Sequence, residues 1–278
     1  MVKITEHGTQ HPTFRTAGIR ESGSQQDRTW HVPEETPVAF VYNKRNYAVM
    51  MATPDDLVDF AIGFSLSEQV VDTAHQIKAI DIQHSERGVD FRIDIDQQRL
   101  ERLDIIQRRR NLVGSASCGL CGLENAETLF EPLPRVSDKF LTLTTEAVSL
   151  ALESLRNHQR LNAKTHTVHG AAWADLSGSI AYTREDVGRH NALDKLIGCM
   201  ALKEVDLTSG FVVMSSRCSY ELVEKASRFG IPAMVTISAP TSFALAKARE
   251  AKISLYARSP MGVVEFLVDD AEVLRQSS

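Results

Sequence analysis

The sequence predicts an α/β protein with a mixed-sheet layer in its C-terminal half and a smaller α+β subdomain before it. Helix and strand patterns alternate from about residue 145 onward, and two hairpin patterns flank one helix pattern in the first half. The 278 residues are 43% hydrophobic and 24% charged, enough for a sizeable core. We expect a polar N-terminal tail over 1–30, the α+β subdomain over 31–135 and the α/β domain over 136–278.

The first half predicts a hairpin, a helix and a second hairpin. Two apolar runs within 37–51 enclose a polar turn that begins at Asn43, which is typical of a β-hairpin. Thr53 is the expected cap of a helix of about three turns, with Pro54 in its first turn. The buried stripe of this helix is expected to be Leu57, Phe60, Ala61 and Phe64. Strict apolar alternation within 80–95 predicts the second hairpin.

The second half predicts alternating helices and strands after the prolines at 132 and 134. The expected helices cover 145–157, the region around 193–197, the region around 222–226 and 244–251. The expected strands cover 165–173, a stretch through 182, 211–214, 234–237 and the regions near 255 and 264. Serine-rich turns follow two of these strands, at 215–217 and 238–242, where ligands gather in open α/β sheets. Both turns also suit simple helix caps.

Charge and hydropathy exclude several classes of protein. The formal net charge of −5 argues against a general nucleic-acid binder, so an anionic ligand would need a local cluster of donors. The first thirty residues lack the apolar core of a signal peptide, and no later stretch reaches the roughly 20 apolar residues that span a bilayer. We therefore expect a cytoplasmic protein that binds neither nucleic acid nor membrane.

One pair of cysteines carries the expected chemistry. Cys118 and Cys121 form a Cys-x-x-Cys motif in a glycine- and serine-rich loop after the arginines 108–110, whereas Cys199 and Cys218 are expected to be buried thiols. A structural zinc site needs four ligands, and a dithiol oxidoreductase places its first thiolate at a helix start. A flexible loop instead favours a persulfide carrier, which must visit a donor and an acceptor.

A zinc-dependent deaminase is the rival interpretation of the same motif. Its signature is His-x-Glu followed by Pro-Cys-x-x-Cys, and His84 and Glu86 precede Cys118 and Cys121 in that order. However, Ser117 replaces the proline, and the histidine and glutamate lie at a polar turn where solvated side chains are common.

The segment 184–195 is unusually polar for a junction between a strand and a helix. In one interpretation Asp186 caps the helix, and Asp194 and Lys195 form its solvated face. In the other, the helix start with Arg189 and His190 forms an anion site. A histidine among small apolar residues, such as those at 166 and 169, is more often an interior group than a ligand.

The longer motifs resemble those of the FdhD/NarQ family of formate dehydrogenase accessory sulfurtransferases. They are Pro37-Val38-Ala39, the segments 51–54 and 63–68, Cys118-Gly119-Leu120-Cys121-Gly122, 185–195 and Ser215-Ser216-Arg217. The resemblance implies a cytidine-deaminase-like fold and a homodimer. It implies that Cys118 receives persulfide sulfur from a cysteine desulfurase, assisted by Cys121. The sulfur then passes to the bis(molybdopterin guanine dinucleotide) molybdenum cofactor, before that cofactor enters apo formate dehydrogenase, with no permanent metal.

The resemblance also assigns cofactor contacts to one C-terminal stretch. It consists of Tyr256, Ala257, Arg258, Ser259, Pro260 and Met261. Concentrated donors for the phosphates of the cofactor are expected at Arg189, His190, Arg217 and Arg258, with Asp186 or Glu185 as the acceptor for guanine. A non-catalytic chaperone of the cofactor, with structural cysteines, is a further interpretation.

Overall fold

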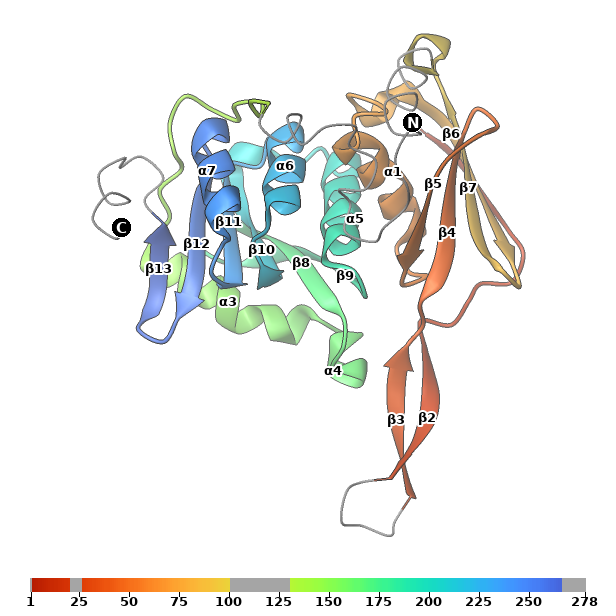
Figure 1. Cartoon of the computed structure of the whole chain (residues 1–278), viewed down its shortest axis with the longest axis horizontal. Helices are drawn as coiled ribbons and strands as arrows, with labels where there is room; N and C mark the ends of the chain where they lie inside the picture. The colour runs from red at the N-terminus through yellow and green to blue at the C-terminus, as the bar shows by residue number, and fades with distance from the viewer. Residues whose placement is uncertain (1, 21–26, 101–130, 267–278) are drawn as a thin grey trace. The chain divides into compact units, whose positions relative to one another are not determined.

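The computed structural model describes residues 2–20, 27–100 and 131–266, and the chain divides into two compact units (Figure 1). The first unit comprises Met1–Arg108, Arg156–Ala171 and Thr183–Glu204, and the second comprises Arg109–Leu155, Ala172–Tyr182 and Val205–Ser278. This division differs from the predicted boundary near residue 136. The reason is that the helix after residue 188 packs on the helix of the first half rather than on the elements that follow it.

The first unit contains a five-stranded sheet of order β1-β6-β7-β4-β5. Its strands are β1 (Lys3–His7), β4 (Thr36–Tyr42), β5 (Arg45–Ala52), β6 (Ile77–Ser85) and β7 (Gly88–Ile95). Both predicted hairpins are confirmed, and the β4–β5 turn places Asn43 and Lys44 at φ 45° and 67°, as a tight hairpin turn requires. The prediction of a polar tail over 1–30 is wrong for its first residues, because residues 3–7 form a strand that pairs in parallel with β6.

The helix of the first half is α1 (Leu57–Ser67), and the predicted buried stripe is confirmed. Its start is not capped as predicted. The hydroxyl of Thr53 accepts a hydrogen bond from the backbone N–H of Val187, and Asp56, in the left-handed region at φ 51°, precedes the first turn. Thr53 is thus used for a tertiary contact instead of a local one.

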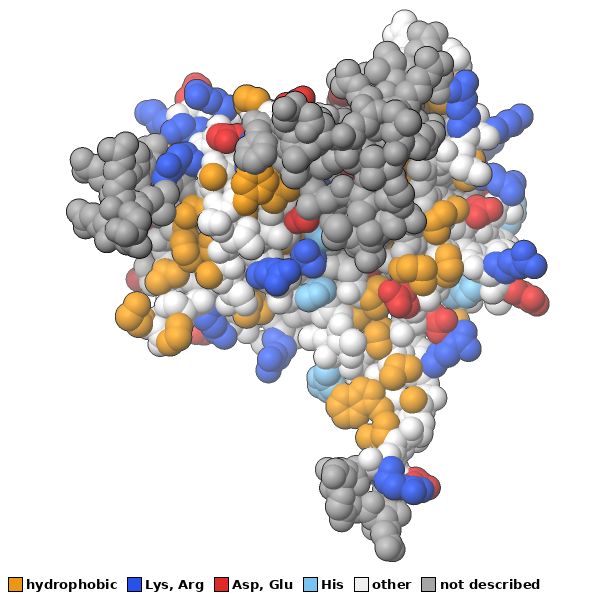
Figure 2. All heavy atoms as spheres, in the orientation of Figure 1, with side chains coloured by type: hydrophobic (Ala, Val, Ile, Leu, Met, Phe, Trp, Pro, Cys, Tyr) orange, Lys and Arg blue, Asp and Glu red, His pale blue; other side chains and the backbone are white. Residues whose placement is uncertain are grey.

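A second feature absent from the predicted tail is a two-stranded hairpin of β2 (Phe14–Arg20) and β3 (Asp27–Pro33). Figure 2 shows hydrophobic side chains on its surface, and Trp30 is 43% exposed. An isolated hairpin is only marginally stable in water. Contacts at its base support it: the Trp30 ring lies 5.6 Å from that of His166, and the Lys164 ammonium lies 5.0 Å from the Phe14 ring centroid.

A six-stranded sheet of order β13-β12-β11-β10-β8-β9 forms the α/β layer. Its strands are β8 (His169–Asp175), β9 (Ile180–Asp186), β10 (Gly210–Arg217), β11 (Ala233–Ser238), β12 (Ser254–Ser259) and β13 (Gly262–Phe266). Strands β10, β11 and β12 are parallel, and β13 is antiparallel to β12. The predicted strand at 165–173 begins later, because α4 (Asn162–Thr165) ends there with His166 in a left-handed conformation.

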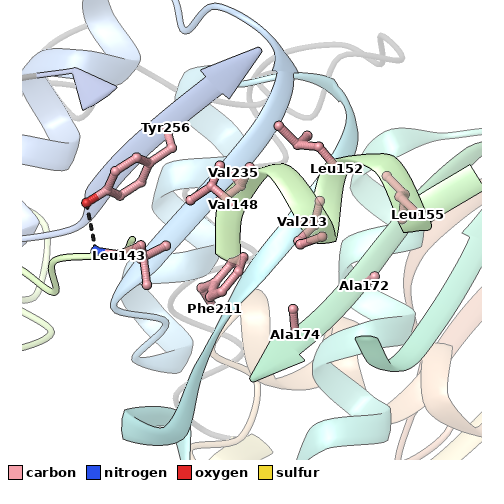
Figure 3. Close-up of a cluster of buried hydrophobic side chains, with 12 residues drawn as sticks. Leu143, Val148, Leu152, Leu155, Ala172, Ala174, Phe211, Val213, Val235 and Tyr256 are labelled. Carbon is pink, nitrogen blue, oxygen red and sulfur yellow. Dashed lines mark hydrogen bonds between the residues drawn. The ribbon is translucent and has the colours of Figure 1, made fainter. Parts of the chain in front are cut away.

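The core of the second unit lies between α3 (Thr145–His158) and one face of this sheet (Figure 3). Val148 and Leu152 of α3 pack with Phe211 and Val235 of the strands. Strand alternation turns residues such as Met234 to the other face, where α6 (Tyr220–Phe229) and α7 (Ser242–Ala251) lie in Figure 1. The predicted α/β fold class is confirmed.

The remaining described elements are α5 (Arg189–Leu202) and two short 3₁₀ turns, Ala74–Gln76 and Leu207–Ser209. Among the helices that the structure describes, none combines the length and the apolar character needed to cross a membrane.

Candidate functional site

The predicted sulfur site, Cys118 and Cys121, lies outside the described residues, as do the arginines at 108–110. The structure therefore bears on the predicted anion-binding segments. Asp186, Arg189 and His190 belong to the first unit, whereas Arg217 and 256–261 belong to the second.

Two glycines set the geometry of the first of these segments. A Cβ added to Gly63 of α1 would lie 1.7 Å from the backbone oxygen of Asp194, and one added to Gly198 of α5 would lie 1.9 Å from the backbone oxygen of Asp59. Helices can approach this closely only where side chains are missing. As a result, the face of α5 that carries Asp194 and Lys195 is buried against α1, and the prediction of a solvated face is wrong.

Lys195 and Asp186 form a fully buried ion pair. The Lys195 Nζ lies 2.7 Å from the Asp186 Oδ2, and both side chains are 0% exposed. The same oxygen accepts from the backbone N–H of Thr53, while Oδ1 accepts from the N–H of Gly188 and from the amide of Asn191, all at 2.8–2.9 Å. A buried charge is tolerated when it is paired and hydrogen-bonded in this way.

This network changes the role expected of Asp186. The residue before α5 is Gly188, which has no side-chain cap, so Asp186 holds the helix start from two residues away. Because both of its oxygens are occupied and its side chain is buried, we assign it a positioning role rather than direct contact with guanine.

Glu185 is also occupied inside the first unit. Its two oxygens accept from the backbone N–H groups of Leu161 and Asn162, each at 2.8 Å, at the start of α4. Burial raises the pKa of Glu185 above its ordinary value. The preceding Arg184 donates to Asp59 at 2.6 Å. Much of the polar density at 184–195 is therefore internal structure.

Arg189 and His190, the first two residues of α5, remain as the part of the segment predicted to bind an anion. The Arg189 Nε is buried and has no hydrogen-bond partner among the residues that the structure describes. His169, the first residue of β8, is half-buried, and burial together with the positive charges of Arg189 and His190 lowers its pKa. Arg189 and His190 thus lie at a helix start, where the helix dipole favours negative charge.

The sequence did not predict His169 as a site residue. It was expected to be an interior group, and its only distinguishing signal is its place beside Gly170 at the start of a strand. Because β8 and β9 are neighbours in the sheet, His169 at the start of β8 lies near the end of β9, after which α5 begins.

In the second unit, Arg217 and Arg258 lie at the carboxyl ends of the parallel strands β10 and β12. Arg217 is exposed and aligned with Ser238 at the end of β11, so the structure brings the three strand ends to one edge of the sheet. Ligands commonly bind at such an edge. The predicted capping role of the second serine-rich turn is confirmed, because the Thr241 hydroxyl accepts from the backbone N–H of Ala244.

The predicted cofactor stretch 256–261 divides into a buried and an exposed part. Tyr256 belongs to the core: its hydroxyl accepts from the N–H of Leu143 and donates to Glu265, and burial raises its pKa to about 12 (Figure 3). Ala257 is also buried. Since the side chains of Tyr256 and Ala257 are both buried, only Arg258, Ser259, Pro260 and the exposed Met261 remain as predicted contacts.

Of the two described residues of the rival zinc site, His84 differs from the sequence expectation and Glu86 agrees with it. His84 is not solvated: its side chain is 1% exposed, and its Nε2 lies 2.7 Å from a carboxylate oxygen of Glu6. The cause is β1, which pairs in parallel with β6 at the edge of the sheet and carries Glu6. Glu86 is exposed in the β6–β7 turn. Within the described ranges, no group of three or more His, Cys, Asp or Glu side chains is arranged to hold a metal ion.

Comparisons with known proteins place these features in a family. The family model described as the FdhD/NarQ family matches residues 33–262. The sulfur carrier protein FdhD of Xanthomonas oryzae pv. oryzae is 47% identical over 224 residues, which cover 81% of this chain and 79% of that protein. The sulfur carrier protein FdhD of Burkholderia cenocepacia is 44% identical over 250 residues, 88% of each chain.

A solved structure has the same fold. It is described as that of a candidate formate dehydrogenase accessory protein from Desulfotalea psychrophila, and it matches with a TM-score of 0.66 and 24% identity, over 92% of this chain and 97% of that one. The family model matches residues 33–262, and these two relatives are 47% and 44% identical to this chain. The chain belongs to the FdhD/NarQ family.

Proposed function

We propose that this protein is a sulfur carrier for the maturation of formate dehydrogenase. Its relatives in Xanthomonas and Burkholderia are named sulfur carrier proteins. The structural observation that supports the proposal is the start of α5, which has no side-chain cap and where the buried Nε of Arg189 has no hydrogen-bond partner among the described residues. Such a site suits a phosphate-bearing acceptor of the sulfur.

In the proposed first step, Cys118 takes sulfur from the persulfide of a cysteine desulfurase. The Cys118 thiolate attacks the terminal sulfur of the donor, a new S–S bond forms on Cys118, and the donor leaves as a thiolate. The arginines 108–110 precede Cys118 closely in the sequence, and cationic neighbours favour the thiolate form of a cysteine.

In the proposed second step, Cys121 releases the sulfur. Its thiolate attacks the inner sulfur of the Cys118 persulfide, so that a Cys118–Cys121 disulfide forms and hydrosulfide leaves toward the acceptor. A dithiol reductant then returns both cysteines to thiols. The acceptor is the bis(molybdopterin guanine dinucleotide) molybdenum cofactor, as substrate, before it enters apo formate dehydrogenase.

The residues present fit the phosphates of that substrate. Arg189 and His190 offer donors at a helix start whose dipole favours negative charge. Taken by itself, the second unit offers Arg217 and the stretch 258–261 as proposed contacts with substrate phosphates, because they lie at the carboxyl edge of its parallel strands.

Sulfur loading tests the carrier role. We expect the purified protein, incubated with a cysteine desulfurase and cysteine, to gain the mass of one sulfur atom, and Cys118→Ala to abolish the gain because the accepting thiolate is lost. Cys121→Ala should still load but release sulfur slowly. Cys218→Ala is the matched control, since that thiol is buried and its pKa is raised to about 12 by burial. Unchanged loading of Cys118→Ala would assign the persulfide elsewhere.

Two other outcomes would favour the alternative functions. Stoichiometric zinc in a freshly purified sample, bound through Cys118 and Cys121, would favour the deaminase-like enzyme. Binding of the cofactor without any loading of sulfur would favour a chaperone.

Nucleotide binding tests the acceptor site separately. We expect Arg189→Ala to weaken the binding of GDP, the guanine and diphosphate part of the substrate, by roughly tenfold or more, as the loss of a charged hydrogen bond predicts. Sulfur loading should be unchanged. Arg156→Ala, an exposed arginine at the end of α3, is the matched control in isothermal titration calorimetry. Equal affinities of the two variants would remove Arg189 from the site.

A further inference from the structure

We propose that β5, an edge strand of the five-stranded sheet, pairs antiparallel with β5 of a second copy of this chain. The two strands meet around a two-fold axis at Val49, so that one sheet continues through both copies. The resemblance to the family implies a homodimer but names no surface for it. The pairing of β5 depends on neither sulfur transfer nor anion binding, and it is therefore independent of the proposed function.

The two edges of this sheet differ in how they are protected. Unpaired strand edges invite association, and proteins commonly guard them with charged side chains or proline. At one edge, β1 has the sequence Lys-Ile-Thr-Glu-His, in which three of the five side chains are charged or ionisable. At the other edge, residues 46–52 of β5 include neither a charged residue nor a proline. The β5 edge is thus the one that is open to pairing.

The register of β4 and β5 determines which backbone groups face the open edge. Pro37 lies opposite Met51 and has no N–H, so these two residues cannot be a doubly hydrogen-bonded pair of the antiparallel ladder. Because such pairs alternate along a strand, the N–H and C=O of Val49 and Met51 point away from β4. The Met51 carbonyl indeed accepts a hydrogen bond at 2.8 Å from the Asn191 side chain of α5. Among the described residues, no such contact is found for the Val49 backbone.

The side chains at this edge are apolar and exposed. Side chains alternate across a strand, so Val49 and Met51 share one face, where they are 66% and 46% exposed. With the axis at Val49, the two Val49 side chains lie side by side, and each Met51 lies near residue 47 of the other copy. Pairing therefore covers both exposed side chains. It also gives the Val49 N–H an acceptor and the Val49 C=O a donor.

The charges at the two ends of β5 favour an antiparallel second copy as the occupant of this edge. Exposed Lys44 and Arg45 lie at the start of the strand, and exposed Asp55 follows its end. In an antiparallel pair, residues equally far from the axis lie opposite each other, so the basic start of one β5 approaches Asp55 of the other copy. A parallel pair would instead bring like charges together.

Sedimentation equilibrium of the full chain tests the pairing. We expect the 30.8-kDa chain to form a dimer reversibly, since the contact is small. Val49→Lys should raise the dissociation constant by roughly a hundredfold or more, because it sets two like charges against each other at the axis. Ile4→Lys is the matched control and should leave the dimer unchanged, since Ile4 is 44% exposed in β1, at the other edge. Urea denaturation of both variants checks that the fold is kept.

A cysteine at the axis tests the register. Residues directly opposite in a hydrogen-bonded antiparallel pair have Cα atoms about 5.5 Å apart, which a disulfide can bridge. Val49→Cys, in a background with Cys118→Ser and Cys121→Ser, should therefore form a disulfide-linked dimer when oxidised glutathione accepts the electrons of the two thiols. Dithiothreitol should release the monomers. Ile4→Cys in the same background is the matched control and should stay monomeric on a non-reducing gel.

Three results would overturn the inference. The first is a chain that sediments as a monomer at every concentration. The second is a dimer that Val49→Lys leaves intact, or that Ile4→Lys weakens equally, because either result would place the contact elsewhere. The third is a Val49→Cys variant that forms no disulfide-linked dimer. The sulfur-carrier role has its own separate test, because the sulfur loading of Cys118 is measured by mass and does not depend on the β5 edge.

Discussion

Lys195→Met is expected to lower the free energy of unfolding by about 3–5 kcal/mol, since it leaves the carboxylate of Asp186 buried without its countercharge. Methionine keeps most of the volume of the lysine side chain, so the effect reports the charge rather than a cavity. The loss should appear in urea denaturation near pH 7 as a lower midpoint with an unchanged slope.

Two companion variants make this measurement specific to the ion pair. Adding Asp186→Asn to Lys195→Met removes the uncompensated charge and should recover part of the stability. Lys247→Met is the matched control: Lys247 is also buried, but its partner Glu250 is 41% exposed and can be solvated by water once the lysine is gone. Its loss should therefore be smaller. If Lys195→Met and Lys247→Met lower the free energy of unfolding by the same small amount, the ion pair of Asp186 and Lys195 contributes little to stability.

Gly63→Ala and Gly198→Ala are each expected to destabilise the protein by about 3 kcal/mol or more, at the upper end of overpacking effects. The added methyl group would meet backbone oxygen, of Asp194 in one case and of Asp59 in the other. Backbone cannot rotate away as a side chain can, so α1 and α5 would have to move apart. Urea denaturation near pH 7 measures this loss of stability as well.

The control for these two variants is Gly18→Ala. Gly18 lies in β2, and a Cβ built there meets nothing within 4 Å. Its substitution should change stability by about 0.5 kcal/mol or less. Because α5 also carries Arg189 and His190, the helix variants should in addition weaken GDP binding, whereas Gly18→Ala should not. Normal stability of Gly63→Ala would contradict the close approach of the two helices.

Local patterns predicted well wherever one face of an element is buried and the other is not. The alternation at 89–95 and the apolar stripe of α1 identify their elements because burial repeats every two residues in a strand and every three to four in a helix. The strands within the first thirty residues were missed for the complementary reason. They expose most of their side chains, so the polar composition of β2 and β3 resembles that of a tail.

The candidate site shows the same contrast between what local sequence patterns predict and what they miss. Sequence alone determined the α/β class and the resemblance to the FdhD/NarQ family, and it singled out the polar segment 184–195 as a candidate, since motifs and periodicities are written in consecutive residues. Only the tertiary structure separated the members of that segment by role. The close approach of α1 and α5 buries Asp186 and Lys195 as a pair, whereas Arg189 and His190 lie at the start of α5, which has no side-chain cap. Charge and burial depend on which distant segments meet, and no stretch of the sequence contains that information.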